Sequence, residues 1–169
     1  MPDRVAPAGI DETPHKDEPP RLYARRMALE KAVQAAAGAP GDFILAADTV
    51  VAVGRRILPK AEDEAAIRAC LALLSGRRHH VLTAVVVVTP DGQRSERIVD
   101  SAVIFARLEQ PQVDAYVACG EGLGKAGGYA IQGRAAGFIR MLSGSYSGVV
   151  GLPLFETAQL LRGRGYLAP

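Results

Sequence analysis

An apolar run from Ile44 to Val53 (ILAADTVVAV) most strongly limits how this chain can fold. Its alternating and β-branched apolar residues predict a strand buried within a sheet. Asp48 and Thr49 stand in the middle of the run. A charge inside a buried strand must be paired, hydrogen-bonded or neutralised by a shift of its pKa. Asp48 is therefore either a candidate catalytic carboxylate or a strand-ending residue that caps a turn. The run alone does not decide between these two interpretations.

Helical and strand patterns alternate along the rest of the chain. Tyr23, Met27 and Lys31 recur every four residues, so they share one face of a helix. The sequence TPDG at 89–92 is a turn signal between two β-branched runs and predicts a hairpin. The expected helices cover 21–37, 62–74, 111–119 and the residues after Pro153, and the expected strands cover 44–53, 81–89, 94–105, 129–132 and 138–141.

This order of elements predicts an α/β fold with a mixed, twisted sheet flanked by helices. The chain has 169 residues, of which 49% are hydrophobic and 22% charged, a balance that suits one domain with a sizeable core. Residues 1–20 are rich in proline and charge, and they predict an extended arm before the first helix.

Composition also excludes several classes of partner. The formal net charge is +2, from 20 basic and 18 acidic residues, which is too small to predict non-specific nucleic-acid binding. No apolar run approaches a membrane span, and no signal-peptide pattern opens the chain, so we expect no membrane association. Cys70 and Cys119 lie far apart and are expected to be buried free thiols in a reducing compartment, the cytoplasm.

The segment GKAGGYAIQG at 124–133 is the second unusual feature of the sequence. Glycine permits positive φ angles and close approach of the backbone to a ligand. Gln132 ends the short predicted strand, and its amide can both donate and accept, as recognition of a base edge requires. The segment matches neither a dinucleotide-binding nor a P-loop motif. A flexible loop with a structural turn is the alternative interpretation, and composition does not exclude it.

Several charged residues are further candidates for a site. Lys31 lies near the edge of an apolar helix face and can reach over it, while Lys60 lies in a loop before the second helix. Glu12, on the predicted arm, is a candidate metal or water ligand. Each of these residues, taken alone, is equally consistent with an ordinary solvated charge. The sequence RRHH at 77–80 predicts a solvated turn, because neighbouring histidines on an extended chain point apart.

Taken together, these segments resemble the Maf family of nucleotide pyrophosphatases. The matching segments are RMALEKA (26–32), ILAADTVV (44–51), the loop 57–60, LSGRRHHVLTAV (74–85), GKAGGYAIQG (124–133) and SGSYSGVVGLPL (143–154). One such segment is a weak signal, but this many in order over nearly the whole chain are specific. The resemblance implies a single Maf/inosine-triphosphatase-like domain over 1–169, with two lobes around a deep cleft.

The resemblance also implies hydrolysis of a nucleoside triphosphate to the monophosphate and pyrophosphate, with Mg²⁺ or Mn²⁺ as cofactor. ADTV together with YAIQG is similar to the branch of the family that acts on dTTP and UTP. That branch implies Asp48 as the proton acceptor and Thr49 and Gln132 as specificity residues. Asp48 and Thr49 point to opposite faces of a strand, so we expect a strand end or bulge to bring both to the cleft.

The same resemblance assigns the remaining charged candidates. Lys31 and Lys60 would bind the phosphates, and Glu12 would join Asp48 in binding the metal. A homodimer is typical of the family, and a role in division arrest is attributed to it.

This chain departs from the family pattern at two places. Relatives open with a short strand and a Ser-x-Ser-Pro-Arg-Arg loop, and nothing in this chain matches that loop. We expect the recorded start to lie downstream of the true one, since so many other site residues remain. Two functions are alternatives to hydrolysis of dTTP and UTP. The chain could be a regulatory protein that binds nucleotide without hydrolysing it, as the missing loop would favour, or a broad house-cleaning pyrophosphatase for modified nucleotides. PKA at 59–61 stands where relatives have Gly-Lys-Pro, which stiffens the loop around Lys60.

Overall fold

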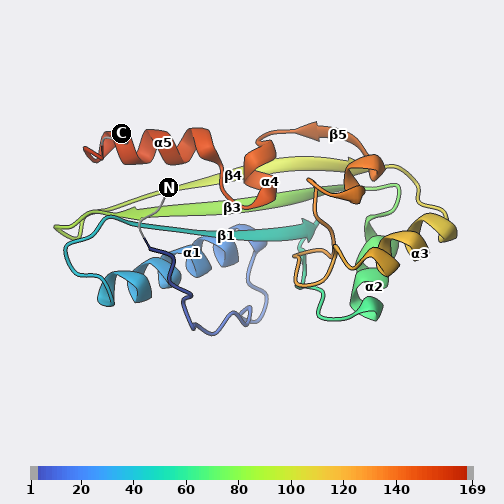
Figure 1. The fold of residues 1–169 in the computed structure, drawn as a ribbon, viewed down its shortest axis with the longest axis horizontal. Coiled ribbons are helices and arrows are strands. Elements are labelled where there is room, and N and C mark those ends of the chain that lie inside the picture. The colour runs from blue at the N-terminus through green and yellow to red at the C-terminus, as the bar shows by residue number, and fades with distance from the viewer. Residues whose placement is uncertain (1–3, 167–169) are drawn as a thin grey trace.

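The computed structural model describes residues 4–166, and these residues form one five-stranded sheet with helices on both faces (Figure 1). The strands are β1 (Ile44–Val53), β2 (Arg56–Leu58), β3 (Arg78–Val88), β4 (Arg94–Phe105) and β5 (Ile139–Ser143), in the spatial order β2-β1-β3-β4-β5. The helices are α1 (Pro20–Ala37), α2 (Glu64–Leu74), α3 (Gln110–Cys119), α4 (Tyr146–Val150) and α5 (Leu154–Gly163), with a 3₁₀ turn η1 (Arg134–Phe138).

The α/β class is confirmed, but the pairing of the strands is not mixed. Every strand pair in the described chain is antiparallel. The short strand β2, which the sequence did not predict, folds back along β1 and reverses the chain before α2. The chain therefore re-enters the sheet at β3 antiparallel to β1. Alternation of helices and strands carries no information about such a reversal, and the prediction of a mixed sheet followed from that alternation.

Most predicted elements are present, and two predictions are wrong. The strand 44–53, the first helix and the hairpin of β3 and β4 are confirmed. The sequence RRHH at 77–80 is not a solvated turn, because β3 already begins at Arg78. Residues 129–132 do not form a strand: 129–130 have no regular structure and 131–132 belong to a turn. The backbone here bonds to a side chain and not to a neighbouring strand, since Ala130 N donates to Tyr116 Oη at 3.1 Å.

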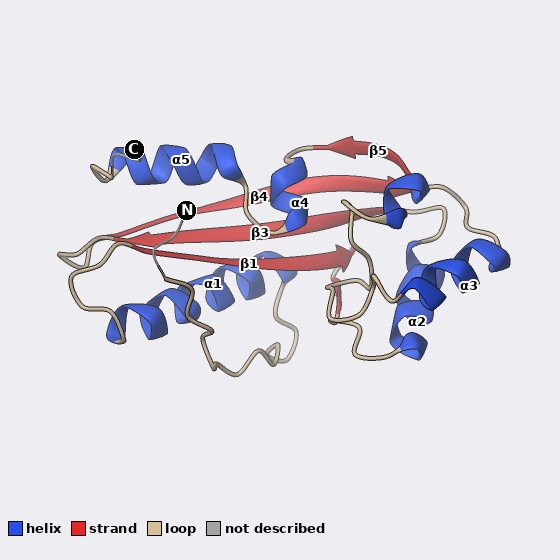
Figure 2. Cartoon of the chain, in the orientation of Figure 1, coloured by secondary structure: helices blue, strands red, loops and turns tan. Residues whose placement is uncertain are grey.

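Helix α1 covers one face of the sheet (Figure 2). Its buried side chains are mostly small, including Ala24, Ala28 and Ala32, so the helix lies close to β1 and β3. Met27 fills the space between them and is fully buried. This close packing sets how far a long side chain on α1 can reach over the sheet.

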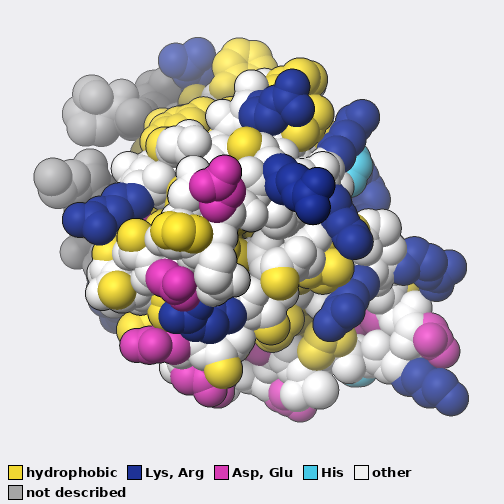
Figure 3. Space-filling view, turned by 90° about the vertical axis from the view of Figure 1, so that its right-hand side faces the viewer, with side chains coloured by type: hydrophobic (Ala, Val, Ile, Leu, Met, Phe, Trp, Pro, Cys, Tyr) yellow, Lys and Arg dark blue, Asp and Glu magenta, His cyan; other side chains and the backbone are white. Residues whose placement is uncertain are grey.

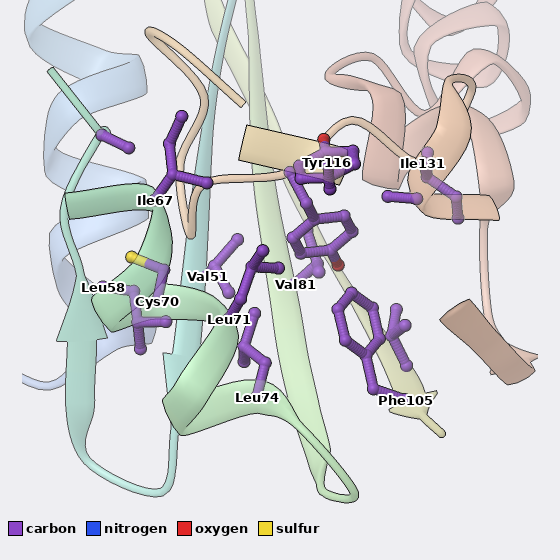
Figure 4. Close-up of a cluster of buried hydrophobic side chains, with 14 of the residues drawn as sticks. Val51, Leu58, Ile67, Cys70, Leu71, Leu74, Val81, Phe105, Tyr116 and Ile131 are labelled. Carbon is purple, nitrogen blue, oxygen red and sulfur yellow. The ribbon is translucent and has the colours of Figure 1, made fainter. Parts of the chain in front are cut away.

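The opposite face of the sheet holds two apolar clusters. Near α2, Leu71 and Leu74 pack against Val51 and Val81 of the sheet (Figure 4). Near α5, Leu160 packs against a second group of sheet residues. Figure 1 shows α1 and α5 beside one half of the long strands, with α2 and α3 at the other end. These helices therefore fall into two groups at the two ends of the sheet.

Residues 4–19 contain neither helix nor strand and run beside α1. Tyr23 Oη donates to Glu12 O at 2.6 Å, and Arg26 donates to Thr13 O at 3.0 Å. Arg26 also forms an ion pair with Glu18 at 2.7 Å. These bonds hold the arm against the helix. Residues 1–3 of the predicted arm lie outside the described residues.

Two further features concern the charges on the surface and the length of the helices. At the α2–α3 end of the molecule, most Lys and Arg side chains lie toward the upper right of the face and most Asp and Glu side chains toward the lower left, with some of each sign on both sides (Figure 3). That face therefore carries no single sign of charge. Among the helices of residues 4–166, none is both long and apolar enough to span a bilayer.

Candidate active site

Asp48 lies in the middle of β1, where it faces α1. It is paired across the ladder with Ala84, and the residue is 9% exposed. Lys31 of α1 donates from Nζ to Asp48 Oδ1 at 2.6 Å. The strand continues to Val53, so Asp48 neither ends the strand nor caps a turn. Of the two interpretations drawn from the sequence, the turn-capping residue is therefore wrong, and the catalytic carboxylate stays a prediction.

Glu12 and Lys60 complete a cluster of charges around Asp48. Lys31 Nζ lies 2.8 Å from Glu12 Oε1 as well as beside Asp48. Lys60 Nζ donates to the other carboxylate oxygen of Glu12. The Asp48 cluster, defined as Glu12, Lys31, Asp48 and Lys60, therefore joins the arm, α1, β1 and the loop after β2. All four residues were expected at the site from the sequence.

The two carboxylates of the Asp48 cluster differ as acids. Burial raises the pKa of Asp48, and the bond from Lys31 only partly opposes it. Burial also raises the pKa of Glu12, but its bonds to Lys31 and Lys60 outweigh burial and place the pKa below the usual range. Burial lowers the pKa of Lys31, yet its two carboxylate partners outweigh that effect and raise it. Asp48 is thus the better proton acceptor, and Glu12 is the more firmly ionised carboxylate.

The glycine-rich segment holds the loop that carries Lys60. Ala61 N donates to Lys125 O at 3.1 Å, and Gly127 N donates to Pro59 O at 3.0 Å. Gly127 has φ +69°, and a Cβ there would lie 2.8 Å from a methyl group of Val51. Any larger residue would push the segment away from β1. The glycine is therefore required for packing against the sheet, and this packing fixes Lys60 above the strand.

A hollow of about 210 Å³ wraps around the edge of β1 beside the Asp48 cluster. Lys31 and Asp48 line it from the α1 face, and Thr49 and Val150 line it from the α4 face. Strand β2 pairs only with residues 51–53, so within residues 4–166 the stretch around Asp48 forms an edge of the sheet. The expected strand end or bulge at Asp48 is wrong. The ladder is regular there, and the open edge lets both faces of the strand reach one hollow.

Gln132 lines the same hollow from the turn after Tyr129, where it is exposed. Lys125 and Tyr129 also line it, and the sequence patterns had not singled out either residue. Tyr129 Oη lies 2.8 Å from Nε2 of the fully buried His79 on β3. The proposed specificity residues Thr49 and Gln132 therefore share a hollow with the Asp48 cluster.

The donor set of the Asp48 cluster fits a magnesium or manganese ion held jointly with substrate. Glu12 and Asp48 offer carboxylate oxygens, and no group of three or more His, Cys, Asp or Glu side chains suited to a metal occurs within residues 4–166. Mg²⁺ characteristically keeps several waters and binds one or two carboxylates together with substrate phosphates. The two carboxylates meet that requirement, whereas a closed site made only of protein ligands does not form.

A larger hollow, about 380 Å³, lies elsewhere on the molecule and lacks such chemistry. Phe43, Asp91 and Arg164 are among its lining residues. The guanidinium of Arg164 already donates to Ser95 Oγ at 2.6 Å, and the exposed Asp91 accepts from Gln93 at 2.7 Å. The polar groups of the larger hollow are thus already hydrogen-bonded to other protein groups. The smaller hollow at β1 is therefore the candidate active site.

Comparison with known proteins identifies the class to which this fold and site belong. A family model described as Maf-like protein matches residues 1–164, so the chain belongs to the Maf family. A dTTP/UTP pyrophosphatase of Caulobacter vibrioides is 63% identical over 165 residues, which cover 98% of this chain and 86% of that protein. A dTTP/UTP pyrophosphatase of Granulibacter bethesdensis is 65% identical over 171 residues, covering 93% and 80%. A third, from Novosphingobium aromaticivorans, is 60% identical over 164 residues, covering 97% and 82%.

Proposed function

We propose that this protein is a nucleoside triphosphate pyrophosphatase of the cytoplasm that hydrolyses dTTP and UTP to the monophosphate and pyrophosphate. The observation that carries the proposal is the buried carboxylate of Asp48, bonded to Lys31 and placed in one hollow with Gln132. The similarity to three dTTP/UTP pyrophosphatases at 60–65% identity supports the choice of substrate.

Asp48 acts as the proton acceptor in the reaction. It takes a proton from water while the water oxygen bonds to phosphorus, the anhydride bond between the α and β phosphates breaks, and pyrophosphate leaves. Burial raises the pKa of Asp48, so its carboxylate is more basic than that of an exposed Asp. The bond from Lys31 holds the carboxylate in one orientation for this transfer.

Lys31 and Lys60 neutralise the triphosphate. In the structure their ammonium groups contact Glu12, which occupies the position of an anion between them. Phosphate oxygens of a bound substrate take over part of these bonds and stabilise the charge that develops as the anhydride breaks. A magnesium or manganese ion bound by Asp48 and Glu12 would supply further positive charge at the phosphates.

Gln132 and Thr49 select the base. Both residues offer hydrogen-bonding groups in the hollow, and both are uncharged. A site built on hydrogen bonds rejects a base that leaves the polar groups of the protein unpaired. Pyrimidines that match these groups are accordingly preferred.

Pyrophosphate release from a panel of nucleotides tests the proposal. We expect release from dTTP and UTP with Mg²⁺ or Mn²⁺, little release from CTP or 7-methyl-GTP, and loss of activity when the metal is chelated. Equal rates with all four nucleotides would instead indicate a broad house-cleaning enzyme. Nucleotide binding without any release would indicate a regulatory protein, and either result would contradict the proposal.

The pH dependence of kcat/KM tests the role of Asp48. A proton acceptor must be ionised, so activity falls as the pH drops through its pKa. Because burial raises the pKa of Asp48, we expect the acidic limb of the profile for dTTP to lie above the ordinary Asp range, near 3.8. An acidic limb at or below that range would contradict a raised pKa of the proton acceptor.

A further inference from the structure

Thr49 has a hydrogen-bonded partner beneath the hollow that the proposed mechanism does not use. Thr49 and Thr83 face each other in the ladder of β1 and β3, and their hydroxyl oxygens lie 3.0 Å apart. Thr83 Oγ1 also lies 2.7 Å from the backbone oxygen of Gly148 in α4. Thr83 is 1% exposed, so water does not compete for its hydroxyl. The three groups form a short chain that leads from α4 to the hollow.

The direction of the hydrogen bonds in this chain follows from its chemistry. A backbone carbonyl only accepts, so the one proton of the Thr83 hydroxyl points to Gly148 O. The Thr83 oxygen then has only lone pairs to offer to its neighbour. Thr49 must therefore donate its own proton to Thr83. The oxygen of Thr49 is left with lone pairs alone, and it presents an acceptor to the hollow.

The end of the chain at Gly148 is firmly fixed. Ser145 caps α4 by accepting from Gly148 N at 3.0 Å, and Ser145 N donates to Ser101 Oγ of β4 at 3.0 Å. A Cβ on Gly148 would lie 3.1 Å from the Ser145 side chain, so the backbone packs closely here. The carbonyl of Gly148 cannot turn away without disturbing α4, and the direction of the chain is built into the fold.

We propose that Thr83 is a positioning residue that makes Thr49 a hydrogen-bond acceptor and thereby selects uracil and thymine over cytosine. This inference rests on the proposed function, because it places a pyrimidine base beside Thr49. Uracil and thymine carry a proton on N3, whereas cytosine carries a lone pair there. An acceptor fixed at Thr49 pairs with the N3 proton but opposes the lone pair of cytosine, which leaves both groups unpaired.

Binding of two non-hydrolysable nucleotides tests the proposal without depending on turnover. The probes are the α,β-imido analogues of UTP and CTP with Mg²⁺, measured by calorimetry. We expect the wild type to bind the uridine analogue roughly tenfold more tightly or better, the usual effect of one mismatched hydrogen bond. Thr83→Val keeps the shape but removes the hydroxyl, so the preference should fall to within about threefold of unity. Thr83→Ser keeps the hydroxyl and should retain the preference.

Three results would overturn the proposal: a wild type without uracil preference, a Thr83→Val variant that keeps the preference, or equal loss in both variants. A purely structural role of Thr83 would weaken the two analogues alike and leave their ratio unchanged. The proposed function fails separately. If the wild type prefers the uridine analogue but releases no pyrophosphate from dTTP, the enzymatic activity is wrong and the role of Thr83 stands. Binding of neither analogue would contradict both.

Discussion

Replacing Asp48 with Asn is expected to lower kcat for pyrophosphate release from dTTP by about 10³-fold, within the range that general base catalysis supplies. Asn has nearly the same shape as Asp, but its amide cannot take the proton of the attacking water. Its oxygen can still accept the bond that Lys31 now makes to Asp48 at 2.6 Å. Lys31 also keeps its contact with Glu12 at 2.8 Å, so the cation stays paired. Steady-state kinetics at saturating dTTP and Mg²⁺ measure the change.

The fold of the Asp48→Asn variant should be intact. The pKa of Asp48 is raised in the folded protein, so above that pKa its ionisation costs folding free energy. A neutral Asn avoids this cost, and the urea midpoint should therefore equal or exceed that of the wild type. Asp100→Asn is the matched control, because Asp100 is also a strand carboxylate with a nitrogen partner, His80 at 2.7 Å, but lies outside the hollow. Retained pyrophosphate release in Asp48→Asn, or loss in the control, would contradict the assignment.

The sequence predicted Asp48 because a carboxylate inside an apolar run is energetically costly. The spacing of Tyr23, Met27 and Lys31 likewise predicted that Lys31 extends from the buried face of α1, and the structure confirms that position. The contact of Glu12 with Lys31 and Lys60 could not be predicted from local sequence patterns in this way. It depends on docking of the arm through Tyr23 and on the loop that carries Lys60, which are contacts between segments far apart in the chain. Local patterns do not encode such contacts, and the family resemblance supplied them.

Strand β3 also contains a polar residue within an apolar run. Thr83 interrupts the apolar run from Val81 to Val88 in the same way that Asp48 interrupts its own run, and both are buried. The Thr83 hydroxyl is uncharged and threonine is common in strands, so only the weaker rule that a buried polar group needs a hydrogen-bond partner points to it. The strand predicted at 129–132 failed for another reason: Tyr129 and Ile131 alternate because a turn buries both of them. In the sequence, alternating buried residues look the same whether or not the segment pairs with a neighbouring strand.

Acidification from pH 7 to pH 4 is expected to destabilise the protein by about 3 kcal/mol through His79 alone. His79 is fully buried on β3, where its ring contacts Phe105 and Tyr129 at centroid distances of 5.1 and 5.5 Å. Its Nε2 lies 2.8 Å from Tyr129 Oη, and its Nδ1 is buried without a hydrogen-bond partner. Burial of the ring disfavours the charged imidazolium, the neighbouring His80 disfavours it further, and together they lower the pKa of His79 to about 4.

The sign of the effect follows from the two pKa values. The pKa of His79 is about 4 in the fold and near 6.5 in the unfolded chain. Between these values the unfolded chain binds a proton that the folded protein does not, so stability falls as the pH drops from 6.5 to 4. Urea unfolding at pH 7 and pH 4 measures the loss. His79→Gln cannot titrate and should lack this component, although it is less stable at pH 7 because the ring contacts are lost.

Comparing the loss of stability between pH 7 and pH 4 in the wild type and in His79→Gln gives the contribution of His79 alone. Glu12 and other carboxylates with lowered pKa values also stabilise the protein less at pH 4 than at pH 7. Their contribution is the same in the wild type and in His79→Gln, so it cancels when the losses of the two proteins are subtracted. His15→Gln is the control, because His15 is exposed on the arm, whereas burial and the neighbouring His80 are what lower the pKa of His79. It should keep the full loss of the wild type. An equal loss in His79→Gln and the wild type would show that His79 is not the group that titrates.

The His79 variant also separates folding from catalysis at low pH. Tyr129 connects His79 to the hollow, so acid unfolding and protonation of Asp48 would both reduce activity in the wild type. If the acidic limb of kcat/KM is the same in the wild type and His79→Gln at pH values where both are folded, His79 does not cause it, which is the result expected if Asp48 does. A limb that moves with the variant would instead assign the loss of activity to the pair of His79 and Tyr129. If the limb does not move, the two titrations act at different points, with protonation of Asp48 proposed to stop the chemical step and protonation of His79 expected to unfold the wall of the hollow.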